Sequence, residues 1–406
     1  MKNVLYITYD GLTDPLGQSQ ILPYLKELTK EGFQITILSF EKKNRFEKEK
    51  EIVYKVVDSS RINWIPLQFT SNPPVLSKIF DRWKLKQRAF RICRKEKFDA
   101  IHCRSYVASE IGLKIKREFK IPFLFDMRGF WADEKVDNGQ WDQKHFFYRF
   151  IYRYYKRKER AFLLNADAII TLTQAARDYL LSQPGFEHLV IDVIPCCADM
   201  DYFDYHNISP EKISSVKSDL KIPGTAKVLT YSGSIGGWYL TKDMFTFFKM
   251  LTELDPDYVM LILSKDDAAK IAAEAMASGI PKNKVFITYS DRNHLPAFLA
   301  LSTVGIFFIR NTFSKMASSP TKHAELMAMG IPVICNAIGD TGSIVKDTKT
   351  GIVVDELTKN SFQNALKGIK ELEEINKELI RASAFSRFDL ALGIRKYSEI
   401  YNRIMN

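Results

Sequence analysis

The sequence predicts an α/β protein built from two doubly wound parallel sheets. Three observations support this prediction. Short β-branched and aromatic runs alternate with longer amphipathic segments along the whole chain. These runs are mostly apolar throughout, as expected for strands that helices cover on both faces. At 406 residues the chain is also too long for one ordinary hydrophobic core.

The predicted strands fall into two groups. The first half of the chain contains "NVLYITY", "QITILSF", "INWIPL", "DAIHCR", "PFLFDM", "AIITLT" and "IDVIPC". The second half contains "KVLTYSG", "YVMLIL", "KVFITYS", "VGIFFI", "IPVICN" and "GIVVD". Ligands of such sheets bind outside the carboxyl ends of the strands, so the loops after the strands are where we look for function.

A polar stretch from Asp201 to Lys227, rich in Pro, Ser and charged residues, predicts the junction between two domains. We place an amino-terminal domain at residues 1–204, a second domain at 205–384, and a terminal segment at 385–406. Two similar domains joined in this way would face each other across a central cleft.

Composition excludes several classes of protein. No run of roughly 18 apolar residues is present, and the amino terminus "MKNVLYITYDG" reads as a buried strand instead of a signal peptide. We therefore expect a cytoplasmic protein. The five cysteines and six histidines show no metal-ligand spacing, so we expect reduced thiols, no metal and no cofactor.

The net charge of +11 is concentrated in one region. Residues 78–160 contain 23 Lys and Arg against 11 Asp and Glu, so the remainder of the chain is close to neutral. Two segments there, "RWKLKQRAFRICRKEKF" and "KHFFYRFIYRYYKRKER", read as helices that mix cations with aromatics. Such helices suit an anionic membrane surface. The alternative is that the aromatics pack on the sheet while the cations face water. No nucleic-acid-binding motif is present, so we do not expect a nucleic acid partner.

The stretch "SSPTKHAELMAMGIPVI" combines a helix start with a cation. Ser319 is a suitable N-cap, Pro320 fits the first helical position, and Gly330 ends the helix. Lys322 then lies in the first turn, where a cation is unfavourable unless an anion joins it. A phosphate would be such an anion.

Glu325 follows Lys322 by one turn on the same helix face. A carboxylate there can accept hydrogen bonds from a vicinal diol such as a ribose. The stretch therefore favours a phosphorylated sugar or nucleotide as ligand. The alternative is a surface helix whose two charges form an exposed pair that contributes little.

With these segments placed, the chain resembles the family-four retaining glycosyltransferases of the GT-B fold, of the bacterial surface-polysaccharide type. The resemblance rests on "DPLGQSQILPYLKELTKEGFQITILSF", "NADAIITLTQAARDYL", "IDVIPCCADMDYF", "YSGSIGGWY" and "SSPTKHAELMAMGIPVICN" in that order. The terminal "FDLALGIRKYSEIYNRIMN" is similar to the helix that returns to the first domain in this family.

The resemblance implies transfer of a sugar from a nucleotide donor, expected to be UDP-linked, with retention of anomeric configuration and no bound metal. The chain departs from the family where Ala317 replaces a second glutamate and Ser234 an arginine. Some cation must stabilise the leaving diphosphate, so we assign catalytic roles to Lys322 and Arg310, with Lys242 as a further candidate. The predicted donor-binding residues are Gly17, Gly233, Ser234, Lys242, Ser318, Ser319, Pro320, Thr321, Lys322 and Glu325.

Residues after the strands of the first domain are candidates for the acceptor side. Asp126, where many relatives have a histidine, is a third predicted catalytic residue, which could orient a donor-sugar hydroxyl or the acceptor. An ion pair with Arg128 is the structural alternative. His102, Arg104, Arg128 and Glu134 are the predicted acceptor-binding residues. Gly17 either lets backbone approach the donor or forms a plain turn.

The predicted function is therefore glycosyl transfer to a saccharide acceptor, expected to be lipid-linked, in surface glycan biosynthesis. The membrane interpretation places the protein peripherally at the inner face of the plasma membrane. Two alternatives stay open. One is another GT-B enzyme such as a sugar-nucleotide epimerase, and the other is a silent partner that binds nucleotide sugar or membrane without transfer.

Overall fold

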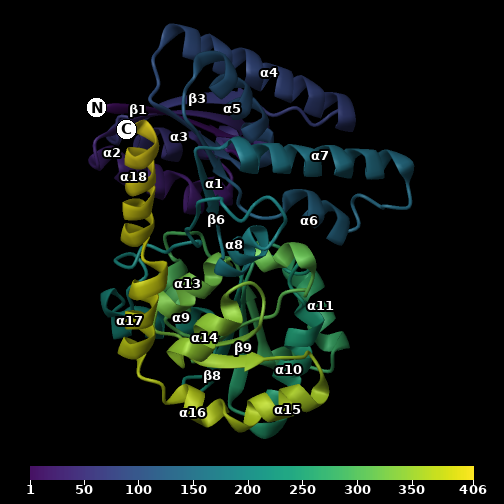
Figure 1. Cartoon of the computed structure of the whole chain (residues 1–406). Coiled ribbons are helices and arrows are strands. Elements are labelled where there is room, and N and C mark those ends of the chain that lie inside the picture. The colour runs from purple at the N-terminus through teal and green to yellow at the C-terminus, as the bar shows by residue number, and fades with distance from the viewer. The chain divides into compact units, whose positions relative to one another are not determined.

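The computed structural model describes residues 1–73 and 76–406 in full, and residues 74 and 75 through their backbone only. The chain forms two compact domains (Figure 1). The amino-terminal domain comprises Met1–Pro195 and Ala391–Asn406, and the carboxyl-terminal domain comprises Cys196–Leu390.

The amino-terminal domain contains a seven-stranded sheet in the order β3-β2-β1-β4-β5-β6-β7, and every pairing is parallel. The order reverses after β1, so ligands are expected beyond the carboxyl ends of β1 and β4. The strands are β1 (Lys2–Thr8), β2 (Phe33–Glu41), β3 (Asn63–Gln68), β4 (Ala100–Arg104), β5 (Phe123–Asp126), β6 (Ala168–Thr171) and β7 (Ile191–Val193).

Among the described residues, nine helices belong to this domain. They are α1 (Pro15–Gln20), α2 (Leu22–Lys30), α3 (Lys43–Ser59), α4 (Pro74–Lys95), α5 (Ser105–Phe119), α6 (Trp131–Asp137), α7 (Phe146–Asn165), α8 (Gln174–Leu181) and the terminal α18 (Leu390–Met405). All but α18 lie in chain order between the strands, so they form the crossovers that a parallel sheet requires.

The carboxyl-terminal domain contains a six-stranded parallel sheet in the order β10-β9-β8-β11-β12-β13. Its strands are β8 (Lys227–Ser232), β9 (Tyr258–Leu263), β10 (Val285–Thr288), β11 (Val304–Phe307), β12 (Val333–Asn336) and β13 (Gly351–Val354). Its helices are η1 (Tyr205–Asn207), α9 (Pro210–Asp219), α10 (Thr241–Leu254), α11 (Ala268–Ala277), η2 (Lys282–Lys284), α12 (Leu295–Leu299), η3 (Phe313–Ala317), α13 (Thr321–Ala328), α14 (Thr341–Thr348), α15 (Lys359–Lys367), α16 (Ile369–Glu373) and α17 (Lys377–Phe388).

The predicted fold class is confirmed, and each of the predicted runs overlaps one of the observed strands. The reason is burial on both faces. Every residue of β4, β5, β6, β9, β11 and β12 is buried, which requires side chains that are apolar throughout or polar groups with internal partners.

The domain boundaries differ from the predicted ones. The first domain ends at Pro195 instead of residue 204, and the returning segment begins at Ala391 instead of residue 385. Long-range hydrogen bonds explain the difference. Ala198 N–H donates to the Phe388 carbonyl at 2.8 Å, and Leu390 N–H donates to the Ala198 carbonyl at 2.9 Å. These bonds hold residues 196–204 in the second domain, and local composition does not reveal them.

Arg381 of α17 ties this segment to helix α13. Its side chain is buried, and its guanidinium donates to the carbonyls of Phe203, Ala328 and Met200 at 2.6, 2.5 and 2.7 Å. It also pairs with Asp204 at 2.8 Å. Because Ala328 is the last residue of α13, Arg381 satisfies a carbonyl that the end of that helix leaves unpaired.

We expect Arg381→Met to lower the free energy of unfolding by about 3–5 kcal/mol, because it leaves buried carbonyls and a carboxylate without their partner. Urea unfolding of the full chain, followed by circular dichroism, measures this loss. Arg387→Met is the matched control on the same helix. Its ion pair with Asp347, at 3.6 Å, is partly exposed and should contribute less than about 1 kcal/mol. Equal losses in the two variants would contradict the assignment.

Candidate donor site and the buried network of the first domain

The loop after β8 is built from glycines and fixed at several points. Gly233, Gly236 and Gly237 have φ values of 127°, 74° and 63°, which glycine adopts without strain. Ile235 N–H donates to Asp266 at 2.6 Å, and Gly236 N–H donates to the Thr241 hydroxyl at 3.1 Å. The loop is therefore held in one shape at the carboxyl end of a central strand.

Lys322 lies directly against this loop. A Cβ atom at Gly233 would come within 2.9 Å of Lys322 Nζ, so a side chain at that position would collide with the ammonium. Nζ lies over the rings of Tyr231 and Tyr239, at 3.9 and 3.5 Å from their centroids. Gly233 and Lys322, two of the predicted donor-binding residues, thus lie next to each other in the fold.

The Lys322 ammonium is a buried charge without a hydrogen-bond partner among the described residues. The residue is 6% exposed, and Nζ is one of the buried side-chain nitrogens that donate to no acceptor. Burial lowers the pKa of Lys322 well below its usual value, and the carboxylate of Glu325 offsets this only in part. Such a group is unfavourable in the free protein and would be stabilised by an arriving anion.

Glu325 is also buried, and this contradicts the alternative of an exposed surface pair. Its Oε1 lies 3.5 Å from Nη1 of Arg292 in the loop after β10. Burial raises the pKa of Glu325, while Arg292 and Lys322 act in the opposite direction. Arg292 was not predicted from the sequence, because nothing in "SDRNHL" indicates that this loop reaches α13.

Two more cations lie near the loop. The buried Lys315 places Nζ 3.8 Å from the ring centroid of Trp238, and Arg310 places its guanidinium carbon 6.0 Å from the same ring. The Arg310 N–H donates to the Trp238 carbonyl at 2.8 Å, which fixes the end of β11 to the loop. Lys315 was not predicted, because the short helix η3 that buries it has no recognisable sequence pattern.

The remaining predicted donor residues are placed as follows. Lys242 is exposed in the first turn of α10, and Ser234 is exposed in the glycine loop. Ser318, Ser319 and Pro320 lead into α13, and Thr321 is its first residue. Their predicted contacts with a donor stay predictions.

The predicted N-cap of α13 is wrong. Pro320 occupies the N-cap position, and the Ser319 hydroxyl instead accepts a hydrogen bond from the Cys196 N–H at 3.1 Å. The helix end is as predicted, with Gly330 at φ 66° just after α13.

In the first domain, the polar residues predicted to meet an acceptor contact one another. Asp126 Oδ2 lies 3.3 Å from His102 Nε2 and 3.8 Å from Arg104 Nη1, while its Oδ1 lies 3.8 Å from Arg128 Nη1. Burial alone would raise the pKa of Asp126, but Arg128, His102 and Arg104 together lower it below its usual value. The carboxylate is therefore ionised and held by cations, which is the structural alternative for Asp126 and Arg128.

Helix α18 completes this network. His102 Nδ1 lies 2.7 Å from the Tyr401 hydroxyl, and the Tyr397 hydroxyl donates to Asp126 at 3.3 Å. Both nitrogens of the buried His102 ring thus have partners, and burial lowers the pKa of His102, so the ring is neutral. We interpret the network as the attachment of α18 to the sheet. The acceptor contacts predicted for His102, Arg104 and Arg128 stay predictions.

Gly17 and Glu134, the other two candidates of this domain, have different surroundings. A Cβ atom at Gly17 would overlap with the Gly11 carbonyl, so this glycine lets α1 pack against the preceding loop. That loop is held by Glu41, a buried carboxylate that the sequence analysis missed, which accepts from the N–H groups of Leu12 and Thr13 at 2.8 and 3.1 Å. Glu134 is half-buried in the first turn of α6.

Comparisons with known proteins agree with this architecture. The family model described as Glycosyltransferase Family 4 matches residues 20–202, and the model described as Glycosyl transferases group 1 matches residues 213–384. Together they cover most of the chain. No curated protein sequence matches it.

Solved structures similar to the chain include the three proteins that follow. Sucrose-phosphate synthase from Thermosynechococcus elongatus has a TM-score of 0.73 and 14% identity over 99% of this chain and 98% of that one. Anabaena HepE in complex with UDP and glucose has a TM-score of 0.69 and 14% sequence identity, over 98% of this chain and 99% of that one. WaaG, a glycosyltransferase involved in lipopolysaccharide biosynthesis, has a TM-score of 0.67 and 14% sequence identity, over 98% of this chain and 99% of that one. The chain belongs to the glycosyltransferases of the GT-B fold.

Within this glycosyltransferase, no group of three or more metal-ligating side chains occurs among the described residues. Likewise, no helix of the described chain is both long enough and apolar enough to cross a membrane. The residues that the fold does bring together are Lys322, Glu325, Arg292 and the glycine loop of the second domain.

We expect Lys322→Met to raise the free energy of unfolding of the unliganded glycosyltransferase by about 1–3 kcal/mol, because it removes an unsatisfied buried charge. Folding lowers the pKa of Lys322 below its ordinary value of 10.5. At pH values between these two pKa values, the unfolded chain therefore binds more protons than the folded protein. Stability of the parent protein should therefore rise with pH in that window, and the variant should lack this rise.

Thermal and urea unfolding at several pH values measure the effect of this variant. Lys242→Met, an exposed lysine of the same domain, serves as the control and should change stability by less than about 0.5 kcal/mol. A Lys322→Met protein that is less stable than its parent would mean that the ammonium is already satisfied.

Proposed function

We propose that this glycosyltransferase transfers a sugar from a nucleotide-sugar donor, with UDP as the expected nucleotide, to a saccharide acceptor. The observation that carries the proposal is the buried Lys322 ammonium, which lies against the glycine loop and has no hydrogen-bond partner among the described residues. Glu325 lies one turn further along α13. A diphosphate supplies the anion that Lys322 lacks, and a ribose supplies the diol that a carboxylate can bind. Anabaena HepE, which has a similar fold, was solved with UDP and glucose.

In the proposed reaction the acceptor hydroxyl attacks the anomeric carbon from the face on which the diphosphate leaves. The bond between the sugar and the diphosphate breaks, the new glycosidic bond forms, and the hydroxyl proton passes to the leaving phosphate oxygen. This course retains the anomeric configuration and needs no protein nucleophile. The task of the protein is to stabilise negative charge on the diphosphate, which we assign to Lys322 with Arg310 and Lys315.

Arg292 gives this site a second state. Without a donor, its guanidinium neutralises Glu325, at a distance of 3.5 Å. A ribose would bring two hydroxyl donors to the same carboxylate. We therefore propose that Glu325 exchanges part of its interaction with Arg292 for the nucleotide, so that the carboxylate is partnered before and after binding.

We expect Glu325→Gln to weaken binding of the nucleotide donor about tenfold, because an amide oxygen offers a weaker acceptor than a carboxylate. Thermal shifts with UDP-, GDP-, dTDP- and CMP-sugars identify the donor first, and calorimetry with that donor then compares the variants. Glu253→Gln, on the exposed surface of α10, is the matched control. Unchanged affinity in Glu325→Gln would refute the ribose assignment.

The same preparation tests the type of reaction. Product formed only with an added saccharide acceptor, with the donor's anomeric configuration in its NMR spectrum, is the expected result. Conversion of the donor without acceptor would indicate an epimerase, and binding without turnover on any acceptor would indicate a silent partner.

We further propose that the amino-terminal domain binds an anionic membrane surface peripherally, which suits a lipid-linked acceptor in surface glycan synthesis. Four exposed apolar residues lie on α4 at helical spacing, namely Leu76, Ile79, Phe80 and Trp83. Three more lie in the first turns of α7, namely Phe146, Phe147 and Phe150. We call these seven residues the apolar patch.

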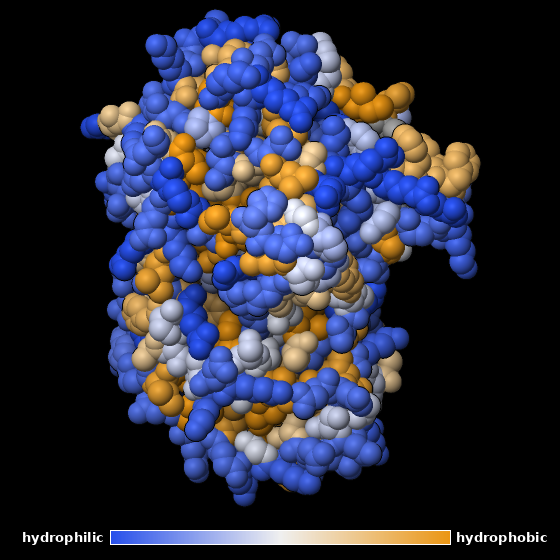
Figure 2. All heavy atoms as spheres, in the orientation of Figure 1, coloured by the Kyte–Doolittle hydropathy of each residue, from blue (hydrophilic) through white to orange (hydrophobic). Residues whose placement is uncertain are grey.

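The two helices are joined close to the apolar patch. Arg82 of α4 donates to the Tyr154 hydroxyl of α7 at 3.0 Å. Figure 2 shows hydrophobic residues at the projecting ends of α4 and α7, bordered by hydrophilic ones. Arg149, Arg153 and Arg157 are exposed at intervals of four residues along α7. Exposed apolar residues beside cations suit insertion among acidic headgroups.

Part of the basic region serves the fold instead. Lys156 Nζ lies 2.9 Å from Asp133 and 2.6 Å from Glu159, and Arg82 forms an ion pair with Glu110. Tyr155 and Phe162 of α7 are buried. The alternative in which the aromatics pack on the sheet therefore holds for these residues but not for the apolar patch.

We expect the triple variant Trp83→Ser, Phe146→Ser, Phe150→Ser to reduce partitioning onto phosphatidylglycerol vesicles at least about tenfold, because it removes the largest exposed rings. Vesicle sedimentation measures this change. Ile52→Ser with Val190→Ser, two exposed apolar residues of the same domain at 55% and 65% exposure, is the control. Equal partitioning of both variants would leave the apolar patch without a membrane role.

A further inference from the structure

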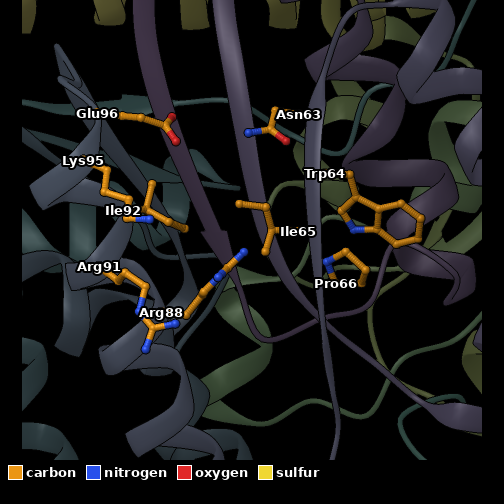
Figure 3. Close-up of a pocket in the computed structure, with 9 residues that line it drawn as sticks. All are labelled: Asn63, Trp64, Ile65, Pro66, Arg88, Arg91, Ile92, Lys95 and Glu96. Atoms are coloured by element: carbon orange, nitrogen blue, oxygen red, sulfur yellow. The ribbon is translucent and has the colours of Figure 1, made fainter.

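A cavity lies in the amino-terminal domain, lined by residues that have not been assigned to either site above. It has a volume of about 520 Å³ and opens between the start of strand β3 and the last turns of helix α4 (Figure 3). All strands of the sheet are parallel, so the start of β3 lies at the amino-terminal edge of the sheet. Asp126 and Arg104 end their strands at the opposite edge. The cavity is therefore separate from the polar network of this domain, and none of its lining residues belongs to the donor site.

Three cations of α4 line one wall of this cavity. Arg88, Arg91 and Lys95 follow one another at intervals of three and four residues, so they lie on one face of the helix. Figure 3 shows Arg88 reaching from α4 toward Ile65 of β3. Like charges at this spacing destabilise a helix, so their grouping needs a compensating reason.

Within the described part of the chain, none of these three cations forms a hydrogen bond or ion pair. Glu96 lines the same cavity but does not pair with any of them. Arg82, Lys84 and Arg94 of the same helix each have an acidic partner, while Lys78 and Lys86 lie over aromatic rings. The cavity thus collects three cations of α4 that have neither kind of partner among the described residues.

The helix dipole accounts for only one of them. Cations are favourable in the last turn of a helix, and Lys95 is the last residue of α4. Arg88 and Arg91 come before that turn, where the dipole effect has faded. Their position therefore points to an external anion.

The opposite wall is mixed. Ile65 and Asn63 of β3 point toward α4 in Figure 3, and Ile92 adds an apolar side chain from α4. Trp64 and Pro66 also border the cavity, but their rings point away from α4 in Figure 3. The Trp64 indole N–H already donates to the Ser39 hydroxyl at 2.9 Å, so it offers no further donor. A ligand that fits this cavity presents negative charge to α4 and a partly apolar surface to β3.

We propose that this cavity binds a phosphate group carried on a partly apolar molecule, held by Arg88, Arg91 and Lys95. The planar guanidinium of arginine donates two parallel hydrogen bonds to phosphate oxygens, which makes arginines at this spacing suited to phosphate. The phosphate has two sources, an acidic lipid headgroup or a free organic phosphate. The exposed apolar residues of the same helix favour the lipid. This site does not depend on the proposed glycosyl transfer.

The test is hydrogen–deuterium exchange of the full chain, read in the peptides that cover residues 63–66 and 88–96. Three probes are compared with sodium chloride at equal ionic strength: glycerol 3-phosphate, phosphatidylglycerol vesicles and phosphatidylcholine vesicles. We expect saturable protection of both peptides by glycerol 3-phosphate or by phosphatidylglycerol. Protection by the first identifies a soluble phosphate, and protection by the second alone identifies a lipid headgroup.

The variant Arg88→Gln, Arg91→Gln should weaken this protection at least about tenfold, because it removes both guanidinium forks. Arg117→Gln with Arg395→Gln, two exposed arginines of the same domain without an ion pair among the described residues, carries the same change of charge as a control. Protection that chloride reproduces, or that persists in the Arg88, Arg91 variant, would overturn the proposal. Donor binding is read in the peptides around Lys322, so failure of one site is distinguishable from failure of the other.

Discussion

The Lys322 ammonium is buried and has no hydrogen-bond partner among the described residues, and the arrangement of the second domain around it depends on this constraint. Lys322 can occupy its place only because residue 233 is a glycine, because two tyrosine rings lie under Nζ, and because Glu325 supplies a nearby negative charge. Each of these features is fixed by a separate element. The loop, the strand β8 and the helix α13 must therefore be positioned together, and the core and Arg381 provide the stability that makes this arrangement possible.

The two domains treat buried charge in opposite ways. In the first domain Asp126 is surrounded by His102, two arginines and a tyrosine, so the chain itself supplies the counter-charge of the carboxylate, although its Oδ1 has no hydrogen-bond partner among the described residues. In the second domain the positive charge of Lys322 has no hydrogen-bond acceptor among the described residues. A charge that the chain itself balances stabilises a fold, whereas a buried charge without an acceptor is retained where a ligand completes it. This contrast, more than any motif, is the reason we propose that the second domain binds the anion.

The sequence predicts the features that depend on local pattern. Continuous apolar runs locate the strands, and the spacing of Lys322 and Glu325 places both on one face of α13. It does not predict what depends on distant contacts. Ser319 looks like an N-cap until Cys196 is known to use its hydroxyl, and residues 196–204 are assigned to the first domain until Arg381 is known to bind them. Arg292 and Lys315 reach their partners from a loop and a short helix with no periodicity, and Glu41 reaches its partners from the last position of β2.

Charge composition has the same limitation, since the basic excess of residues 78–160 is not one surface. Lys156 and Arg82 are bound by carboxylates and hold α7 to α6 and α4 to α5. Arg149, Arg153 and Arg157 face outward beside exposed aromatic rings. Arg88, Arg91 and Lys95 line a cavity. Composition alone counts these cations as equivalent, but a cation contributes to binding only when the fold leaves it without an internal counter-ion. The presence or absence of an internal partner therefore separates one structural role from two proposed binding roles within this basic region.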